Sequence, residues 1–268
     1  MKPSENLTLE ERSGSASERY LEALIEKDRL SYLSGFVQGF VHNINGPLQN
    51  ISMLSEILSK GEDAQDRFVR ARCTDSTEEW EGLYDGQRKR IQQLTQQVFA
   101  IADMLRDFML LHEVERNEAS VDVNLVLSKL ASVFRADLFF KHQVSFDLRL
   151  TKNLPMVKVC GCHLIPSLVH LFRNALTALR GAPEKRLVLE SRLEGDCVRI
   201  LFRDSGCGLA CREGLFDLFV SLWPDQDERE NHLGFGLYAV KRLLEPYGIS
   251  VRLEEAEGET MAIVDIPT

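Results

Sequence analysis

Mostly apolar residues recur at alternating spacings of three and four along two stretches in the first half of the chain. The first stretch comprises Leu33, Val37, Phe40, Ile44, Pro47, Ile51, Leu54 and Leu58, and the second comprises Trp80, Tyr84, Gln87, Ile91, Leu94, Val98, Ile101, Leu105, Phe108 and His112. This period predicts two helices that each carry a coiled-coil seam. The polar residues 60–79 between them predict a hairpin connection, and the polar residues 1–18 predict a flexible N-terminus.

Each predicted helix presents a single apolar face, and two such faces are too few to close a large core within one chain. Pairing two hairpins forms a four-helix bundle, and assemblies of this kind usually have twofold symmetry. We therefore predict that residues 19–117 form a helical hairpin through which the chain assembles into a homodimer.

The pattern changes after about residue 118, where alternating apolar positions indicate strands among shorter helices. It predicts a short strand and a helix before a strand around Phe146, a helix that ends at Gly181, a hairpin over 185–204, a helix over 236–248 and a closing hairpin over 249–267. Because strands and helices do not alternate strictly, the predicted fold class is α+β. Residues 118–268 would form an α/β two-layer sandwich after the helical hairpin, with the boundary near residues 115–121.

The composition is that of an ordinary globular protein. Apolar residues make up 44% and charged residues 27% of the 268 residues, and the net charge of −9 disfavours binding to nucleic acid or anionic membranes. No apolar run approaches the roughly 20 residues that cross a bilayer, and no secretory signal is evident, so we expect a cytoplasmic protein. The six cysteines lack zinc-ribbon spacing, and we predict that they are mostly small buried residues without disulfides.

Three stretches in the second half suit a flat or phosphorylated ligand. The first, Asp204-Ser-Gly206-Cys-Gly208, directly follows a predicted strand. Its glycines would let the backbone approach a flat ligand while the carboxylate accepts a hydrogen bond from an exocyclic amine. The same residues also suit a solvent-exposed turn, and the motif alone leaves both interpretations open.

The second stretch, Gly234-Phe-Gly236-Leu237, opens a predicted helix, where unpaired backbone N–H groups and the helix dipole favour phosphate. The third is the predicted helix that carries His170 and Asn174, one turn apart, so that their side chains meet. Asn174 is either an oxygen ligand for Mg²⁺ or a water-facing amide.

His42 and Pro47 stand out in the first predicted helix. At about 100° per residue, His42 points away from the seam that contains Phe40 and Ile44. Pro47 lacks an N–H group and clashes with the carbonyl of Asn43, so it loosens the helix beside this outward imidazole. The arrangement indicates that His42 is a reactive group rather than a core residue.

Taken in order, these stretches resemble the catalytic core of bacterial two-component sensor histidine kinases. HNINGPLQNI at 42–51 looks like the family's H-box, HLFRNALTA at 170–178 like its N-box, DSGCG at 204–208 like its first glycine box, LFDLF at 215–219 like its F-box, and GFGLYAVKRLL at 234–244 like its second glycine box. GETMAIVDIP at 258–267 resembles the family's terminal strand. The resemblance covers roughly residues 25–268, and RNALTAL is closer to the N-box of the nitrogen-regulation type.

The resemblance implies an ATP- and Mg²⁺-dependent protein histidine kinase, with a phosphoacceptor hairpin joined to a Bergerat-type ATP-binding domain. It implies that His42 accepts the γ-phosphoryl group, that Asp204 binds the adenine amine and that Asn174 binds Mg²⁺. Further nucleotide contacts are implied for His170, Gly206, Gly208, Phe216, Phe219, Gly234, Gly236 and Leu237, with an ATP lid over 219–233. The phosphoryl group would then pass to an aspartate in the receiver domain of a response regulator.

The chain departs from the family's pattern at several positions. Asn43 stands at the catalytic position where the family usually has an acid, so it can form hydrogen bonds there but cannot act as a base. Gly46 replaces a residue associated with dephosphorylation, His170 replaces an Asn or Glu, and the lid is acidic. These departures predict slow kinase turnover and argue against the usual route of dephosphorylation.

Other functions therefore remain open. A histidine phosphotransferase would keep the hairpin but lose the ATP-binding glycines, and a pseudokinase would use the same scaffold for partner binding. A coiled-coil adaptor fused to an α/β domain would explain the seams but not the order of the motifs. Because about 25 N-terminal residues are too few for a sensor domain, we expect the input to come from an upstream sensor protein or a region outside this chain.

Overall fold

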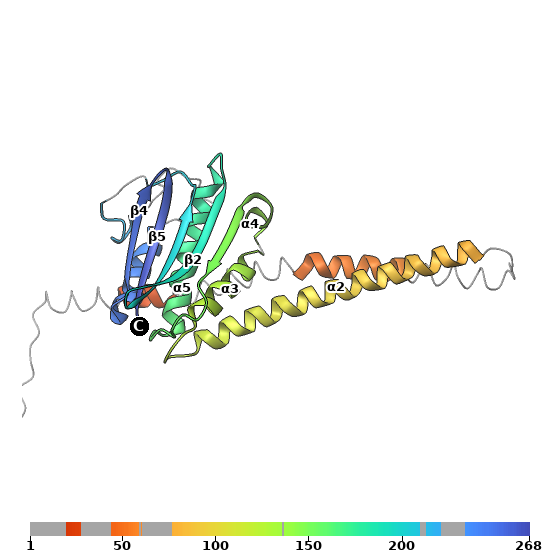
Figure 1. Cartoon of the computed structure of the whole chain (residues 1–268), viewed down its shortest axis with the longest axis horizontal. Coiled ribbons are helices and arrows are strands. Elements are labelled where there is room, and N and C mark those ends of the chain that lie inside the picture. Colours follow the sequence, from red (N-terminus) through yellow and green to blue (C-terminus); the bar gives the residue numbers. More distant parts are fainter. Residues whose placement is uncertain are drawn as a thin grey trace, which may run out of the picture.

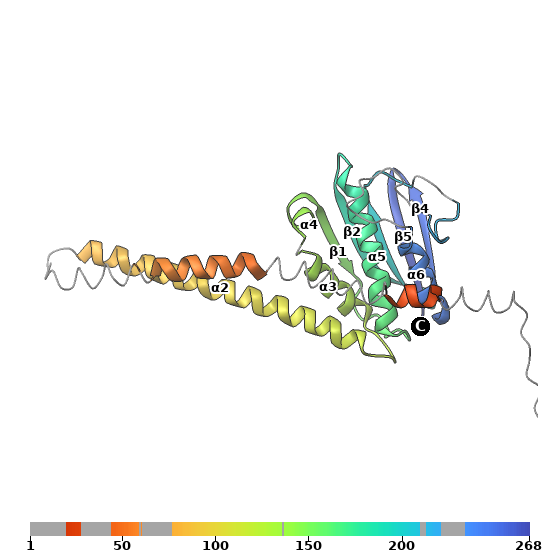
Figure 2. The same cartoon turned by 180° about the vertical axis from the view of Figure 1, so that it is seen from behind.

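A long helix and a sheet-containing unit form the main parts of the molecule. The computed structural model describes residues 20–27, 44–58, 60, 77–135, 137–209, 213–220 and 234–268. Residues 20–27 and 44–58 are helical, and α2 (Thr77–Glu115) extends away from the sheet, with residues 44–58 running along it (Figures 1 and 2). The predicted helical region before the sheet is confirmed.

The apolar seam of α2 is only partly covered within the chain. Its members Ile91, Val98 and Leu105 are 54%, 53% and 42% exposed, and the neighbouring Phe99 and Met109 are exposed as well. Isolated exposed apolar side chains are common, but a row of them along one helix marks a surface that suits another helix.

The C-terminal part of α2 packs against α3 (Val123–Phe134). Asp107 on α2 accepts hydrogen bonds from Lys129 Nζ and Ser132 Oγ of α3, each at 2.6 Å. These contacts fix the end of the long helix to the sheet-containing unit. The bounds 19–117 and 118–268 for the two domains stay a prediction.

The region before the first strand differs from the prediction, because a second helix follows α3 where one helix was expected. Asp137 is the N-cap of a separate helix, α4 (Leu138–Gln143), and its side chain accepts the Phe140 N–H at 2.9 Å. The N-cap at Asp137 starts a new helix within a stretch that the apolar pattern alone presents as one helical segment. The expected short strand is an isolated bridge between Val121 and Val157.

Five strands form one sheet in the order β1-β2-β3-β5-β4. They are β1 (Ser145–Leu150), β2 (Arg186–Glu194), β3 (Cys197–Asp204), β4 (Ser250–Ala256) and β5 (Glu259–Pro267). β1 runs parallel to β2 because α5 (Gly161–Arg180) crosses between them, and the other pairs are antiparallel. The predicted α+β class and both predicted hairpins are confirmed.

Helices cover one face of this sheet and produce the two-layer arrangement. α5 and α6 (Gly236–Leu244) lie on that face in Figure 2, and the 3₁₀ helix η1 (Glu245–Tyr247) follows α6. Phe172 of α5 stacks on Phe134 at 4.0 Å between ring centroids and meets Phe202 of β3 edge-on at 6.0 Å. The core therefore lies between α5 and the inward residues of the strands.

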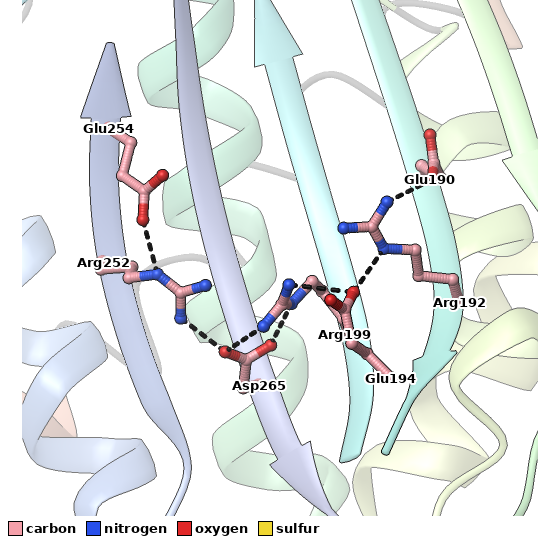
Figure 3. Close-up of polar contacts among 7 residues, drawn as sticks. All are labelled: Glu190, Arg192, Glu194, Arg199, Arg252, Glu254 and Asp265. Atoms are coloured by element: carbon pink, nitrogen blue, oxygen red, sulfur yellow. Dashed lines mark hydrogen bonds and ion pairs between the residues drawn. The ribbon is translucent and has the colours of Figure 1, made fainter. Parts of the chain in front are cut away.

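The opposite face carries a connected set of charged side chains, which we call the outer-face network (Figure 3). At its centre, Asp265 accepts hydrogen bonds from Arg199 Nε at 2.6 Å and Arg252 Nη1 at 2.5 Å. Ion pairs extend the network to Glu190, Arg192, Glu194 and Glu254. Every carboxylate in it faces at least one arginine.

The prediction for the cysteines is wrong in two respects. Cys160 and Cys162 form a disulfide, because a single intervening residue places their Cα atoms 5.2 Å apart. Cys207 is exposed and Cys197 is half-buried, and both are free thiols. Cys73 and Cys211 lie outside the described residues. In the part of the chain that the structure describes, no helix has the length and apolar character needed to cross a membrane.

Candidate functional site

A pocket lies between α5, the sheet and the loop that follows β3. Its empty volume is about 390 Å³, including space open to solvent. The lining residues are Leu171, Asn174, Ala175, Ala178, Phe202, Asp204, Gly208, Leu209, Leu253, Thr260 and Ala262. The structure thus brings together Asn174, Asp204 and Gly208, which the sequence assigns to separate motifs.

Three polar residues form a row across the strands at this pocket. In the strand register, Asp204 of β3 lies opposite Thr260 of β5, and Thr260 lies opposite Glu255 of β4. Asp204 and Thr260 are buried, with exposed fractions of 5% and 7%. The row therefore places polar groups on the inward, helix-covered face, where apolar residues are the rule.

Asp204 is a buried carboxyl group without a neighbouring cation among the described residues. Its Oδ1 accepts a hydrogen bond from the Gly206 N–H at 2.9 Å. Burial raises the pKa of Asp204 to about 7; the Gly206 hydrogen bond lowers it and the charge of Glu259 raises it. A carboxyl group held in this way gains from any ligand that donates a hydrogen bond to it.

Thr260 completes the polar edge of the pocket. Its Oγ1 is buried and has no hydrogen-bond partner within the described residues. A carboxylate beside a free hydroxyl suits a ligand edge that offers a donor next to an acceptor. The edge of adenine has this pattern, with an exocyclic amine beside a ring nitrogen, so these residues fit an adenine base.

The loop after β3 depends on glycine at two positions. A Cβ atom on Gly206 would lie 2.5 Å from the Cβ of Ala178, which real structures do not allow. Gly208 has a φ of +80°, and a Cβ there would lie 2.6 Å from Glu255 Oε1. The same Oε1 accepts the Leu209 N–H at 2.5 Å, so Glu255 fixes this loop beside the pocket.

His170 lies against Gly236 near the start of α6. Asn174 lines the pocket, and His170 lies one turn earlier on α5. A Cβ on Gly236 would lie 3.1 Å from His170 Nδ1, so the first turn of α6 lies directly against this imidazole. Leu237 packs in the core, which leaves only its backbone for the predicted nucleotide contact.

The residues that flank the predicted lid contact each other through their backbones. The Phe219 N–H donates to the Gly234 carbonyl at 3.1 Å, and both residues have a φ of 65°. Phe216 packs against the core, whereas the Phe219 ring is 66% exposed. A backbone hydrogen bond therefore joins the two ends of the predicted lid. The lid residues 221–233 lie outside the described residues.

The predicted phosphoacceptor His42 and its neighbour Asn43 also lie outside the described residues. Gly46 and Pro47 lie within the helical residues 44–58. The geometry of the phosphoacceptor thus stays a prediction.

Two residues of the site were missed by sequence reasoning, and they differ in how readily they could have been found. Thr260 occupies an inward position of an alternating strand, together with Ala262, Val264 and Ile266, so a polar residue there was a usable signal. Glu255 offered no such signal, because its role depends on the loop that packs against β4.

Few protein groups at this site could bind a divalent cation. The described residues contain no group of three or more His, Cys, Asp or Glu side chains that could hold a metal ion. Asn174 offers one side-chain oxygen, and Mg²⁺ commonly binds through few protein groups while phosphates and water supply its other ligands. Asn174 therefore fits a cation that arrives with a phosphorylated ligand.

Comparison with known proteins finds similarity to histidine kinases. Residues 164–268 match the family described as "Histidine kinase-, DNA gyrase B-, and HSP90-like ATPase". An uncharacterized sensor-like histidine kinase, R01002, from Rhizobium meliloti is 30% identical over 129 residues, which cover 47% of this chain and 24% of that protein. The C4-dicarboxylate transport sensor protein DctB from the same organism is 24% identical, over 90% of this chain and 35% of that protein.

Similarity in structure is weaker. The solved structure of the histidine kinase AdeS from Acinetobacter baumannii aligns with a TM-score of 0.45 and 17% identity, over 80% of this chain and 94% of that one. The chain spans between 13% and 35% of the length of the curated relatives it matches. The matched residues 164–268 contain Asn174, Asp204 and Thr260. The chain is thus similar to sensor histidine kinases, and its residues 164–268 match the histidine kinase-like ATPase family.

Proposed function

We propose that this chain is an ATP-dependent protein histidine kinase that phosphorylates its own His42 and passes the phosphoryl group to an aspartate of a response regulator. The observation that carries the proposal is the buried pair Asp204 and Thr260, which suits adenine and lies within the matched ATPase residues. The order of the H-box, the N-box and both glycine boxes supports the assignment.

In this proposal, each end of the pocket holds a different part of the nucleotide. The Asp204 carboxylate accepts a hydrogen bond from the adenine amine, and the Thr260 hydroxyl bonds the neighbouring ring nitrogen. The phosphates extend toward the N-terminus of α6 at Gly236, where backbone N–H groups favour anions. Asn174 supplies an oxygen to the Mg²⁺ that accompanies the phosphates.

The proposed reaction is an in-line transfer to an imidazole nitrogen. A neutral nitrogen of His42 forms a bond to the γ-phosphorus while the bond from that phosphorus to the β,γ-bridging oxygen breaks, which releases ADP. The imidazole gives up one proton to solvent, since Asn43 has no carboxylate to receive it. The phosphoryl group then moves from the imidazole to a carboxylate oxygen of the receiver domain.

The active form would be a homodimer. Exposed apolar residues along α2, including Ile91, Val98 and Leu105, are the seam positions that a second hairpin would cover. We further propose a cytoplasmic protein that receives its input from an upstream sensor. The RNALTAL sequence supports a place in the nitrogen-regulation subgroup.

Labelling with γ-labelled ATP tests this function. The wild-type chain should acquire acid-labile label, because phosphohistidine hydrolyses in acid, and a His42→Gln variant should acquire none. An Asp204→Asn variant should also fail to label, but for lack of nucleotide binding. Label that persists in His42→Gln would contradict the assignment of His42.

A second candidate is a relay or pseudokinase that does not turn over ATP efficiently. Asn43, in place of the usual acid, is the observation that favours it. Calorimetry with a nonhydrolysable ATP analogue and Mg²⁺ separates the two, since a relay that has lost the nucleotide site would release no binding heat. Binding without labelling would indicate a pseudokinase.

A further inference from the structure

The disulfide between Cys160 and Cys162 lies at the start of α5, and neither cysteine lines the pocket. The two cysteines are separated by two positions in the sequence, so the bond closes a very short ring. A ring this short removes little conformational freedom from the unfolded chain and adds little stability. A disulfide that adds little stability to the fold is in turn little stabilised by the fold, so external thiols reduce it more easily at equilibrium.

The two sulfur atoms have different surroundings, which suit the two steps of an exchange. Cys160 is buried and is the N-cap of α5, and its Sγ accepts the Cys162 N–H at 3.3 Å. A thiolate at this position is stabilised by that amide and by the positive end of the helix dipole. Cys162 is only half-buried, so an external reagent reaches its sulfur first.

The residue between the cysteines touches the end of α2. A Cβ atom on Gly161 would lie 2.0 Å from the Val114 carbonyl oxygen, so the backbones of α5 and α2 are in direct contact here. The Gly161 N–H also donates to the Asn117 carbonyl at 3.0 Å. A change in the backbone of residues 160–162 cannot be absorbed without moving this contact.

The next residue extends the same junction to α6. His163 Nδ1 lies 2.9 Å from the Tyr247 hydroxyl, at hydrogen-bonding distance, and Tyr247 belongs to the 3₁₀ helix that follows α6. The disulfide therefore lies where α2, α5 and the end of α6 meet.

We propose that Cys160 and Cys162 form a reversible thiol–disulfide site, with small-molecule disulfides such as oxidised glutathione as its substrates, and that the internal bond tightens the contact between α2 and α5. The Cys162 thiolate attacks the external disulfide, which yields a mixed disulfide and one free thiol. The Cys160 thiolate then attacks the Cys162 sulfur, closes the internal bond and releases the second thiol. The chain loses two electrons and two protons, and the external disulfide gains them.

Equilibration of the full chain in glutathione buffers tests this site. Alkylation and mass spectrometry follow the Cys160–Cys162 bond as the fraction of oxidised glutathione rises, and hydrogen exchange follows the amides of residues 111–117. We expect the bond to close and reopen reversibly. Amide hydrogen exchange at residues 111–117 should be roughly tenfold faster in the reduced chain, because a disulfide that closes so short a ring contributes only a small stabilisation.

Two variants serve as controls. Cys162→Ser should show the fast exchange in every buffer, whereas Cys207→Ser, which removes an exposed free thiol elsewhere, should behave as the wild type. The proposal is overturned if Cys160 and Cys162 stay reduced under conditions that glutathionylate Cys207, or if the bond closes without any change in exchange at 111–117. Neither readout depends on phosphoryl transfer, and the wild-type titration stands even if a variant folds poorly.

Discussion

Asp204 and Asp265 lie on opposite faces of the same sheet and show what a neighbouring arginine does to a carboxyl group. On the outer face, burial tends to raise the pKa of Asp265, but hydrogen bonds from Arg199 and Arg252 outweigh it and hold the pKa below its usual range. On the helix-covered face, burial raises the pKa of Asp204 to about 7, and no described arginine offsets it.

The difference separates a carboxylate that is paired within the sheet from one that a ligand could pair. The outer-face network satisfies its own charges, so it needs no further partner and contributes to the stability of the sheet. In the pocket, burial of the Asp204 carboxyl group costs free energy, and the neighbouring Thr260 hydroxyl has no hydrogen-bond partner among the described residues. A ligand that forms hydrogen bonds with both groups would offset these costs. Exchanging one aspartate at a time tests this distinction directly.

Replacement of Asp204 by Asn should have the largest effect. Because the Asn oxygen is needed to accept the Gly206 N–H, its NH₂ group would face the adenine amine of the proposed complex. A site built around such a hydrogen bond discriminates strongly when the bond is lost. We expect the affinity for MgATP to fall by at least about 100-fold. Isothermal titration calorimetry measures it, and Asp265→Asn is the matched control, with an expected change of less than about twofold. Equal losses of MgATP affinity in the two variants would contradict the assignment of different roles to Asp204 and Asp265.

Replacement of Asp265 by Asn should instead reduce the free energy of unfolding. The change leaves Arg199 and Arg252 without their shared carboxylate on a partly screened surface, so we expect a loss of about 1–3 kcal/mol. Urea unfolding measures it. Glu254→Gln, at the exposed end of the same network, should cost less than about 0.5 kcal/mol. A loss from Glu254→Gln as large as that from Asp265→Asn would show that the central position has no special weight.

Much of the fold could be predicted because its signals are local. Strict alternation identifies the hairpin of β2 and β3, and Gly181 marks the end of α5 as expected. The division of the segment before β1 into α3 and α4 was missed, because a cap at Asp137 has little effect on the apolar pattern. The Cys160–Cys162 bond was missed because an argument from the cellular compartment outweighed their close spacing.

The site was predictable where glycines and asparagine mark it, and not where strand register builds it. Asp204, Gly208 and Asn174 were identified from their motifs, and they line one pocket. The row that adds Thr260 and Glu255 depends on how β5 pairs with β3 and with β4. Register between strands that lie far apart in the sequence follows from tertiary packing, which a single sequence does not reveal.

The pH dependence of nucleotide affinity gives an effect of intermediate size. In the proposed site, the ionised form of Asp204 accepts the adenine amine much more strongly than the protonated form does. Its pKa of about 7 means that protonation competes with nucleotide binding below that value. The affinity for MgATP should therefore fall roughly tenfold from pH 8 to pH 6. The same affinity measurements on a His170→Gln variant serve as the control, because this variant lacks the imidazole near Gly236 and should show the same pH dependence. An affinity that is constant between these pH values would contradict the raised pKa.

The same shift predicts how stability depends on pH. A carboxyl group whose pKa is raised in the folded state binds its proton more tightly there, so its contribution to the free energy of unfolding declines as pH rises from about 4 to about 7. Asp265 behaves in the opposite way, because its lowered pKa gives stability that is lost as the pH falls through the folded value. Urea unfolding of Asp204→Asn should lack the decline toward pH 7, whereas Asp265→Asn should retain it.

The smallest expected effect concerns Glu255, which holds the loop beside the pocket without belonging to its polar pair. Removal of its carboxylate in Glu255→Ala frees the Leu209 N–H and loosens the loop, and the affinity for MgATP should fall by about fivefold, the value of one surface hydrogen bond. Glu255→Gln keeps an oxygen that accepts the same N–H, so it should restore most of the affinity. If Gln fails to rescue, the charge of Glu255 matters rather than its hydrogen bond, and the loop is held in another way. Rescue would show that Glu255 differs from both aspartates, because it would affect nucleotide affinity only by holding the loop beside the pocket.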